Sequence, residues 1–299
     1  MLRQLVVNAD DFGLTVGVNE GILDAHDLGI LTSASLFANA PGTVDAIRRA
    51  RSRPSLGVGV HLTLVDGTPT LPARDVPTLV TDGGRFRHSW RPFIVACLQG
   101  RVSLNEVERE LTAQIDRLRS AVPLTHLDAH KHVHAYPPVF AIVARLAARF
   151  GIPAVRVPYE RWSAAAAVGR DSDAPAATRQ QAWLNALLWP WAQRNYRAAA
   201  ALGLRVANFT GRIDTGVLNR RSLRRMLHEL QPGVTELMVH PGYADADLRR
   251  LPTRLVESRL EEVALMCSLE TRATLTRERI TLVRHDLAPS LRRSLRHAS

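Results

Sequence analysis

The chain alternates between short, continuously apolar runs and longer stretches in which apolar residues recur every three or four positions. The short runs are rich in Val, Leu, Ile and Thr and stop at Gly, Pro, Asn or Asp, which is typical of β-strands. The longer stretches have the spacing of helices with one apolar face. The predicted strands are 4–8, 32–38, 57–64, 125–130, 154–157, 205–209, 236–240 and 280–284. The predicted helices are 16–28, 43–52, 104–120, 137–150, 218–230 and 255–269.

Strands that alternate with helices indicate βαβ units and a parallel sheet. Seven or eight such units in 299 residues predict an α/β fold, namely an irregular (β/α) barrel of seven or eight parallel strands. A doubly wound open sheet is the alternative. In a barrel the functional residues lie at the C-terminal ends of the strands, so we expect the chemistry of this protein there.

We expect residues 1–285 to form one barrel domain, because α/β barrels of this size fold as single units. The segment around 160–200 departs from the regular alternation and predicts a lid or an insertion. We expect residues 286–299 to form a basic C-terminal tail. The stretch 68–89 is rich in Pro, Gly and Asp, which predicts a loop after the third strand.

Three of the five tryptophans lie close together, at Trp183, Trp189 and Trp191. Two interpretations are open. The run could be a core or lid helix, or it could be an apolar surface for a lipid-like or extended ligand, since exposed apolar patches mark interaction sites.

Composition narrows the class of protein. Hydrophobic residues make up 46% and charged residues 22%, as in ordinary soluble proteins. Only two cysteines are present, which excludes a disulfide scaffold and a Cys-rich zinc module and favours a reducing compartment. We see neither a secretory leader nor an apolar run long enough to span a membrane, so we expect a cytoplasmic protein.

The formal net charge is +11, and Lys131 is the only lysine among 39 basic residues. Such a charge can attract nucleic acid, anionic lipid or acidic substrates. Most arginine pairs fall on predicted helices next to acids, which favours solvated helix faces. The chain has no nucleic-acid reader motif and no compact basic stripe, so we expect no nucleic-acid partner.

Two adjacent carboxylates, Asp10 and Asp11, directly follow the first apolar strand. Like charges this close repel unless a cation neutralises them. A divalent cation could take one acid as a ligand and leave the other to act as a base. The alternative is a turn in which one acid caps the next helix.

Single histidines stand near the ends of two further strands. His61 lies in the apolar run 57–64, and His240 closes the run 236–240 before a Pro-Gly turn. Each of them alone is also compatible with a core histidine or a turn residue.

The strongest signal is the block 126–134, which holds four of the 11 histidines. On an extended strand, side chains two positions apart share a face. This predicts that His126, Asp128, His130, His132 and His134 lie on one side. His-x-His spacing lets imidazoles converge on one metal, and a nearby carboxylate can fix the tautomer of a ligand.

Asp11, His61 and His130 would each lie near the C-terminal end of a different strand. One Asp and two His with open positions for water suit one catalytic divalent cation. Zinc and magnesium are the first expectation for that ion, with manganese, cobalt or nickel as alternatives. Another metal-dependent barrel, such as a phosphoesterase or an isomerase, usually needs more carboxylates at its strand ends.

These residues resemble the YdjC-like carbohydrate deacetylase family over nearly the whole chain. The matching segments are 8–13, 59–62, 128–134 and the His240-Pro241 turn. Segments 29–35, 130–132 and 157–160 resemble the branch associated with hopanoid biosynthesis. The resemblance implies an irregular (β/α) barrel and a metal-dependent hydrolase that removes the N-acetyl group from an N-acetylglucosamine moiety. The branch implies a bacteriohopanetetrol lipid as the carrier of that sugar, and soluble chitooligosaccharides are the alternative substrates.

The resemblance also implies roles for individual residues. Asp11, His61 and His130 match the metal ligands, Asp10 the base and His240 the acid. His132 could replace His130 as a ligand or position the sugar. The residues expected to bind substrate or support the ligands are Asp128, His132, His134, Tyr159 and Trp183. Gly242 differs from the hopanoid branch, where alanine is more frequent after the proline.

A lipid-linked sugar must be reached from the membrane surface. The tryptophan run and the excess of arginine therefore predict peripheral contact with anionic lipid at the inner face of the membrane.

Overall fold

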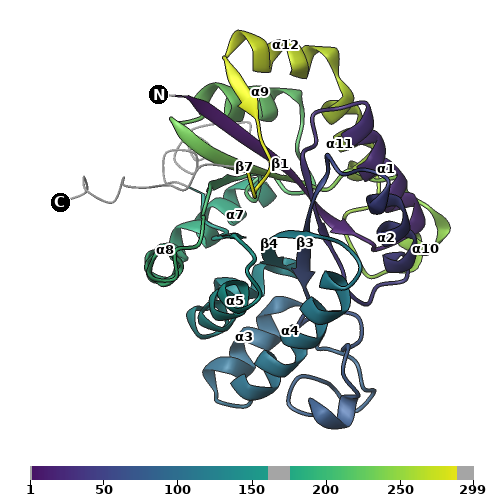
Figure 1. Cartoon of the computed structure of the whole chain (residues 1–299), viewed down its shortest axis with the longest axis vertical. Coiled ribbons are helices and arrows are strands. Elements are labelled where there is room, and N and C mark those ends of the chain that lie inside the picture. Colours follow the sequence, from purple (N-terminus) through teal and green to yellow (C-terminus); the bar gives the residue numbers. More distant parts are fainter. Residues whose placement is uncertain (1, 161–175, 288–299) are drawn as a thin grey trace.

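A single curled sheet of eight strands forms the centre of the protein (Figure 1). The computed structural model describes residues 2–160 and 176–287. The strands are β1 (Arg3–Phe12), β2 (Ser33–Leu36), β3 (Gly57–Leu62), β4 (Leu124–Ala129), β5 (Ala154–Val155), β6 (Asn208–Thr210), β7 (Gly233–Val239) and β8 (Ile280–Leu282). All strand pairs are parallel, and seven strands follow the order β5-β4-β3-β2-β1-β7-β6.

β1 lies in the middle of this sheet and pairs with three other strands. One edge pairs with β7 from Arg3 to Ala9. The other edge pairs with β8 at its beginning and with β2 from Asn8 onward. The two ends of the sheet approach each other, since single parallel bridges join Ala154 to Arg205 and Glu160 to Phe209. The predicted irregular (β/α) barrel of parallel strands is therefore confirmed, and all eight predicted strands are present.

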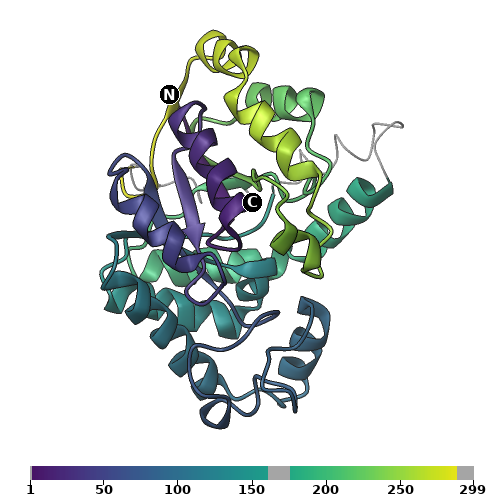
Figure 2. The same cartoon turned by 90° about the vertical axis from the view of Figure 1, so that its right-hand side faces the viewer.

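Helices cover the outer side of the sheet (Figures 1 and 2). Those at predicted positions are α1 (Val16–Asp27), α2 (Thr43–Arg51), α4 (Leu104–Arg119), α5 (Pro137–Arg149), α9 (Arg220–Glu229) and α11 (Ser258–Cys267). The additional helices are η1 (Ala73–Asp75), α3 (Trp90–Leu98), η2 (His130–Ala135), α7 (Ala176–Leu187), α8 (Trp189–Ala201), α10 (Ala246–Arg250) and α12 (Leu269–Arg277). α11 ends earlier than predicted because Ser268 is extended and its side chain caps α12.

The loop between β3 and α3 is held by α4. Glu110 of α4 accepts hydrogen bonds from the backbone N–H groups of Thr70 and Leu71, at 2.7 and 3.0 Å. Gln114, one turn later, bonds both backbone groups of Thr63. Both α4 side chains are fully buried. Because these bonds satisfy buried polar groups, they hold the loop firmly against the end of β3.

α7 and α8 lie within the segment around 160–200 that was predicted to be a lid or an insertion, and residues 161–175 of this segment lie outside the described part. Asn185 of α7 exchanges two hydrogen bonds with the backbone of Glu160, at 3.1 and 2.8 Å. Asn195 of α8 donates to the carbonyl of Ala135 at 2.9 Å. Both amides are buried, so they anchor the helix pair to the loops after β5 and β4.

The tryptophan run lies on these two helices. Trp183 is 73% exposed and Leu187 72%, while Trp189 is 47% exposed. The run is therefore an apolar surface along α7 and the start of α8, and the interpretation as a core helix is wrong for Trp183. Among the described residues, no helix combines the length and the apolar character needed to cross a membrane. Residues 288–299 of the predicted tail lie outside the described part.

Candidate metal centre

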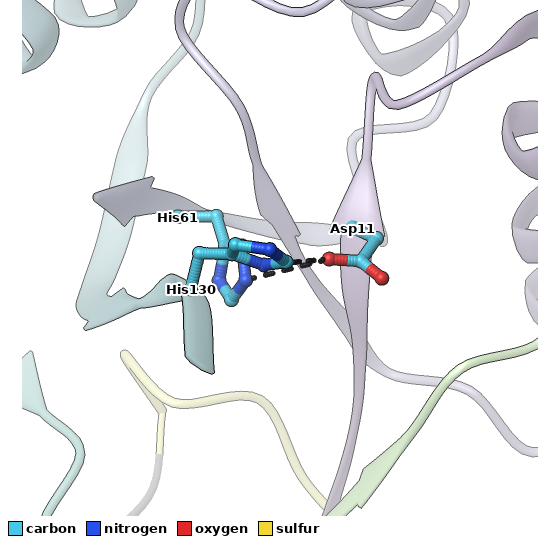
Figure 3. Close-up of side chains that lie close together, drawn as sticks. All are labelled: Asp11, His61 and His130. Atoms are coloured by element: carbon cyan, nitrogen blue, oxygen red, sulfur yellow. Dashed lines mark ion pairs between the residues drawn. The ribbon is translucent and has the colours of Figure 1, made fainter. Parts of the chain in front are cut away.

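Three candidate ligands meet at the C-terminal end of the sheet (Figure 3). Asp11 lies near the end of β1, His61 in β3 and His130 directly after β4. Oδ1 of Asp11 lies 3.2 Å from Nδ1 of His130 and 3.6 Å from Nε2 of His61. One potential ligand atom from each side chain lies within 4.8 Å of the others. The fold thus brings together the triad that the sequence singled out.

The histidine block does not continue as a strand. β4 ends at Ala129, and Lys131 and His132 adopt the left-handed conformation, with φ of 50° and 54°. The prediction that five side chains share one strand face is wrong, because these two residues turn the chain sharply. Non-glycine residues rarely adopt this conformation, and such strain concentrates at functional sites.

The turn sends the last two histidines of the block elsewhere. Nε2 of His134 lies 3.0 Å from the carbonyl oxygen of Arg156, and the His132 ring packs edge-on against Phe209. His126 stays in the strand and stacks on His285, with ring centroids 4.0 Å apart. Of the four histidines in the block, only His130 therefore contacts Asp11.

Carboxylates orient both candidate histidine ligands. Oδ1 of Asp128 lies 2.8 Å from Nδ1 of His61, which leaves Nε2 of that ring facing Asp11. Ser35 donates to the other oxygen of Asp128 at 2.7 Å. On His130, Nδ1 faces Asp11 and Nε2 lies 3.7 Å from Asp66. This arrangement resembles the outer partners that fix the tautomer of metal-ligating histidines.

The charges of the centre leave room for a divalent cation. Four buried carboxylates, those of Asp10, Asp11, Asp128 and Glu236, face only two fully buried guanidinium groups, those of Arg156 and Arg259. With the histidines neutral, as metal ligands are, this leaves an excess of two negative charges in a low-dielectric interior, where unpaired charge is costly. A divalent cation would neutralise that excess, so the donor set fits the predicted metal.

The proton affinity of His130 also indicates that this position attracts a cation. Burial lowers the pKa of this ring, but Asp11 and Asp66 outweigh burial and raise it to about 9. Burial likewise opposes ionisation of Asp11, yet Arg259 and His130 keep its pKa well below the usual range. The position between these side chains therefore attracts positive charge.

Asp10 lies beside this triad but is already paired with a cation. Arg156 donates two hydrogen bonds to it, from Nη2 to Oδ1 at 2.7 Å and from Nη1 to Oδ2 at 2.8 Å. Nη2 also lies 2.7 Å from Asp128 and 2.6 Å from Glu236. Asp10, His61 and Asp128 form a second group with ligand spacing, but Nη2 of Arg156 already contacts both of its carboxylates, whereas Oδ1 of Asp11 faces only the two imidazoles. The triad with Asp11 is therefore the better cation site.

These contacts set the protonation state of Asp10. Burial raises its pKa, but Arg156 outweighs burial, and the pKa falls to about 2. Asp10 is therefore ionised throughout the neutral range.

His240 follows β7 directly and is buried. Burial lowers its pKa to about 4, although Asp11 and Asp10 oppose that shift. The imidazole is therefore neutral near pH 7 in the protein alone. Its backbone N–H donates to Glu262 of α11 at 2.5 Å.

The two remaining predicted site residues, Tyr159 and Trp183, lie outside the buried centre. Tyr159 is buried and its ring centroid lies 5.1 Å from that of Trp189, which joins the end of β5 to the exposed apolar surface. Trp183 points to solvent from α7 and is not part of the buried centre.

Sequence reasoning missed several partners of the centre. They are Asp66, Arg156, Glu236, Arg259 and Glu262. Arg156 and Glu236 stand inside apolar strand patterns, a signal that could have revealed them. Arg259 and Glu262 lie on a helix rich in charges, where nothing in the pattern separates buried from solvated groups.

This fold and centre agree with the comparison to known proteins. Residues 4–277 match the family of YdjC-like proteins, so the chain belongs to this family.

Curated relatives are named carbohydrate deacetylases. One from Brevibacillus brevis is 45% identical over 157 residues, which cover 52% of this chain and 60% of that enzyme. One from Geobacillus stearothermophilus is 44% identical, and the match covers 51% of this chain and 59% of that enzyme. The matches thus span about 60% of the length of these two relatives. One from Halalkalibacterium halodurans is 32% identical, and the match covers 89% of this chain and 96% of that enzyme.

A solved structure from Enterococcus faecalis has a similar fold. It is described as a candidate cellobiose-phosphate cleavage protein, with a TM-score of 0.77 and 25% identity. The match covers 97% of this chain and all of that one, which extends the fold similarity to the full barrel.

Proposed function

We propose that this protein is a metal-dependent carbohydrate deacetylase that removes the acetyl group from an N-acetylglucosamine moiety. The observation that carries this proposal is the convergence of Asp11, His61 and His130 at the strand ends, next to the ionised Asp10. The names of the curated relatives support the same reaction. We include residues 1–285 in one catalytic barrel domain, with the lid or insertion at 160–200 and the basic tail at 286–299.

Asp11, His61 and His130 would hold one divalent ion, zinc or magnesium in the first instance, with manganese, cobalt or nickel as alternatives. When bound, such an ion lowers the pKa of water and polarises the acetyl oxygen. His61 would offer Nε2, because Asp128 engages its other nitrogen. His130 would offer Nδ1, the nitrogen that faces Asp11.

Asp10 would act as the general base. It stays ionised because Arg156 neutralises it, and the bidentate contact fixes the direction of its oxygens. A carboxylate with so low a pKa holds a proton weakly, so Asp10 would release the proton again within the same turnover.

His240 would deliver a proton to the leaving amine. Because the ring is neutral near pH 7, it would have to gain that proton during the reaction rather than begin with it. Its fixed backbone, bound to Glu262, supports this role by limiting where the ring can move.

For the substrate, we propose an N-acetylglucosaminyl group on a bacteriohopanetetrol lipid. The exposed Trp183, Leu187 and Trp189 support an apolar ligand, and Tyr159 links that surface to the end of β5. Soluble chitooligosaccharides are the second candidate, favoured by the carbohydrate named for the relatives and by the burial of the proposed catalytic residues.

We further propose a cytoplasmic protein that contacts the inner face of the membrane peripherally. Flotation with anionic vesicles at low salt tests this proposal, with a Trp183→Ser/Leu187→Ser variant as the comparison. We expect the wild type to float and the variant to remain in the soluble fraction. Equal behaviour of the two proteins would contradict a role for this surface.

The reaction is tested with the purified full chain, diacetylchitobiose and N-acetylglucosaminyl bacteriohopanetetrol, each with and without a chelator. Mass spectrometry follows the loss of one acetyl group. Chelator-sensitive loss from the hopanoid alone supports the full proposal. Loss from chitobiose alone retains the deacetylase and overturns the lipid. Loss from neither substrate by metal-loaded protein contradicts the proposed reaction.

A further inference from the structure

One fully buried arginine on α11 contacts the candidate ligand Asp11. Nη2 of Arg259 donates to Oδ2 of Asp11 at 2.6 Å. The other oxygen of the same carboxylate, Oδ1, faces His130 and His61 at 3.2 and 3.6 Å. The two oxygens of Asp11 therefore have separate partners, one a guanidinium and the other the candidate cation site.

The same arginine also reaches the turn that carries His240. Its Nη1 lies 3.5 Å from the carbonyl oxygen of His240, and its own carbonyl accepts from the N–H of Gly242 at 3.3 Å. Glu262, one turn later on α11, accepts from the N–H of His240. One helix face thus contacts a candidate metal ligand and holds the adjacent turn at three points.

The opposite side of this turn packs tightly against α1. A Cβ atom on Gly21 would lie 2.5 Å from Cα of Gly242, closer than real atoms approach. A Cβ on Gly242 would lie 3.2 Å from both Val18 and the Arg259 side chain. Because the turn is confined between α1 and the arginine, a shift of Arg259 has to move it. A Cβ at position 242 would therefore require its neighbours to move slightly.

A buried guanidinium carries a large desolvation cost, which an apolar side chain in the same place would avoid. Among the described ion pairs, the carboxylate that compensates Arg259 is that of Asp11. The charge partner of Arg259 is therefore the candidate ligand itself, and a single charge-assisted hydrogen bond from Nη2 holds Oδ2 of that carboxylate.

We propose that Arg259 is a positioning residue that holds Oδ2 of Asp11, so that Asp11 presents only Oδ1 to the cation. The same side chain also contacts the turn of His240, so the orientation of Asp11 and the position of that turn both depend on Arg259. This inference rests on the proposed metal-dependent function, because it assigns the geometry of that metal site.

The test measures metal binding by the full chain without any substrate. Zn²⁺ affinity is measured by competition with a chelating dye, and the visible absorption of Co²⁺-loaded protein reports the coordination geometry. In Arg259→Met, we expect Zn²⁺ affinity to fall about 10- to 100-fold, as for other residues that orient ligands. We also expect an altered Co²⁺ spectrum, because the second oxygen of Asp11 is released.

Two further variants separate positioning from general packing. Arg259→Lys keeps a cation near Oδ2, and we expect it to restore most of the affinity and the wild-type Co²⁺ spectrum. Glu261→Gln changes an exposed residue of the same helix that contacts none of the described groups of the centre, so both metal readouts should match the wild type. If Arg259→Met does not fold, Arg259→Gln takes its place under the same criteria.

Wild-type Zn²⁺ affinity and an unchanged Co²⁺ spectrum in folded Arg259→Met would overturn the inference, as would a wild type that binds neither ion. Acetate release is measured in parallel. A wild type that binds Co²⁺ but releases no acetate from an N-acetylated sugar contradicts the proposed reaction. The metal readouts would then still decide the role of Arg259.

Discussion

Arg156 and Asp10 form a bidentate ion pair inside the barrel, with N–O distances of 2.7 and 2.8 Å. The pair joins residues 146 positions apart in the sequence. Charge-assisted contacts of this kind fix the direction of a carboxylate as well as its ionisation. The proposed base is therefore positioned by the fold before any substrate arrives.

Replacing Asp10 by asparagine should remove the base but retain the metal. We expect Asp10→Asn to lower kcat about 10²- to 10⁴-fold, the usual contribution of a general base. Because Asp10 lies outside the triad, bound metal per chain should equal that of the wild type. Acetate release and elemental analysis check the two effects, with the exposed Asp247→Asn as control. Near-normal activity would show that another group takes the proton.

Asp128 should matter through His61. We expect Asp128→Asn to weaken Zn²⁺ binding about 10- to 100-fold, because an amide orients His61 without the carboxylate charge. His61→Ala should lose both the metal and the activity, since it removes a ligand. A dye-competition titration measures the affinity, with the exposed Asp116→Asn on α4 as the matched control. An Asp128→Asn affinity equal to that of the control would contradict the support assigned to Asp128.

Removing Arg156 should destabilise the barrel. In Arg156→Met, three buried carboxylates, those of Asp10, Asp128 and Glu236, lose their shared cation. We expect a loss of about 3–5 kcal/mol in the free energy of unfolding, as for other broken buried ion pairs. Excess Zn²⁺ should recover part of this stability and raise the bound metal from one ion toward two. Chemical denaturation with and without Zn²⁺ measures the effect, and a loss below about 1 kcal/mol would refute this view of Arg156.

Glu160 should make stability depend on pH. Burial raises the pKa of this carboxyl to about 7, against an ordinary value of 4.5. Between these pH values the folded state retains a proton that the unfolded chain loses. The free energy of unfolding therefore decreases as pH rises from about 4.5 through 7.

Glu160→Gln removes this titration and keeps an acceptor for the N–H of Ile213. The free energy of unfolding of the variant minus that of the wild type should therefore increase by about 2 kcal/mol from pH 5.5 to pH 8, because only the wild type loses stability through this titration. Urea denaturation at both pH values measures the difference. If the variant and the wild type differ in unfolding free energy by the same amount at both pH values, Glu160 has an ordinary pKa in the folded protein.

The pattern of the chain alone was enough to predict the eight strands, the six helices that follow regular spacing, and the triad of Asp11, His61 and His130. These features are local, because strand ends and helix faces follow from the order of apolar and polar residues. The resemblance to the YdjC-like family rests on the same short motifs. α3 escaped prediction because its short apolar run follows a Pro- and Gly-rich loop and has no clear helical spacing.

The turn after β4 depends on tertiary contacts. The histidine spacing equally suits a strand, and only the left-handed pair at Lys131 and His132 sends one ring to Asp11 and others toward β5 and β6. Such backbone strain persists where surrounding packing imposes it. The solvent exposure of Trp183 likewise depends on how α7 is anchored rather than on its apolar character.

The sequence by itself determined the order of the elements and which chemical groups stand at the strand ends. Only the tertiary structure decided which charges neutralise one another, since Arg156 meets Asp10 across 146 positions and Arg259 meets Asp11 across 248. The physical reason is that apolar periodicity is a property of neighbours along the chain. The pairing of a buried charge depends instead on which distant partner shares its low-dielectric surroundings.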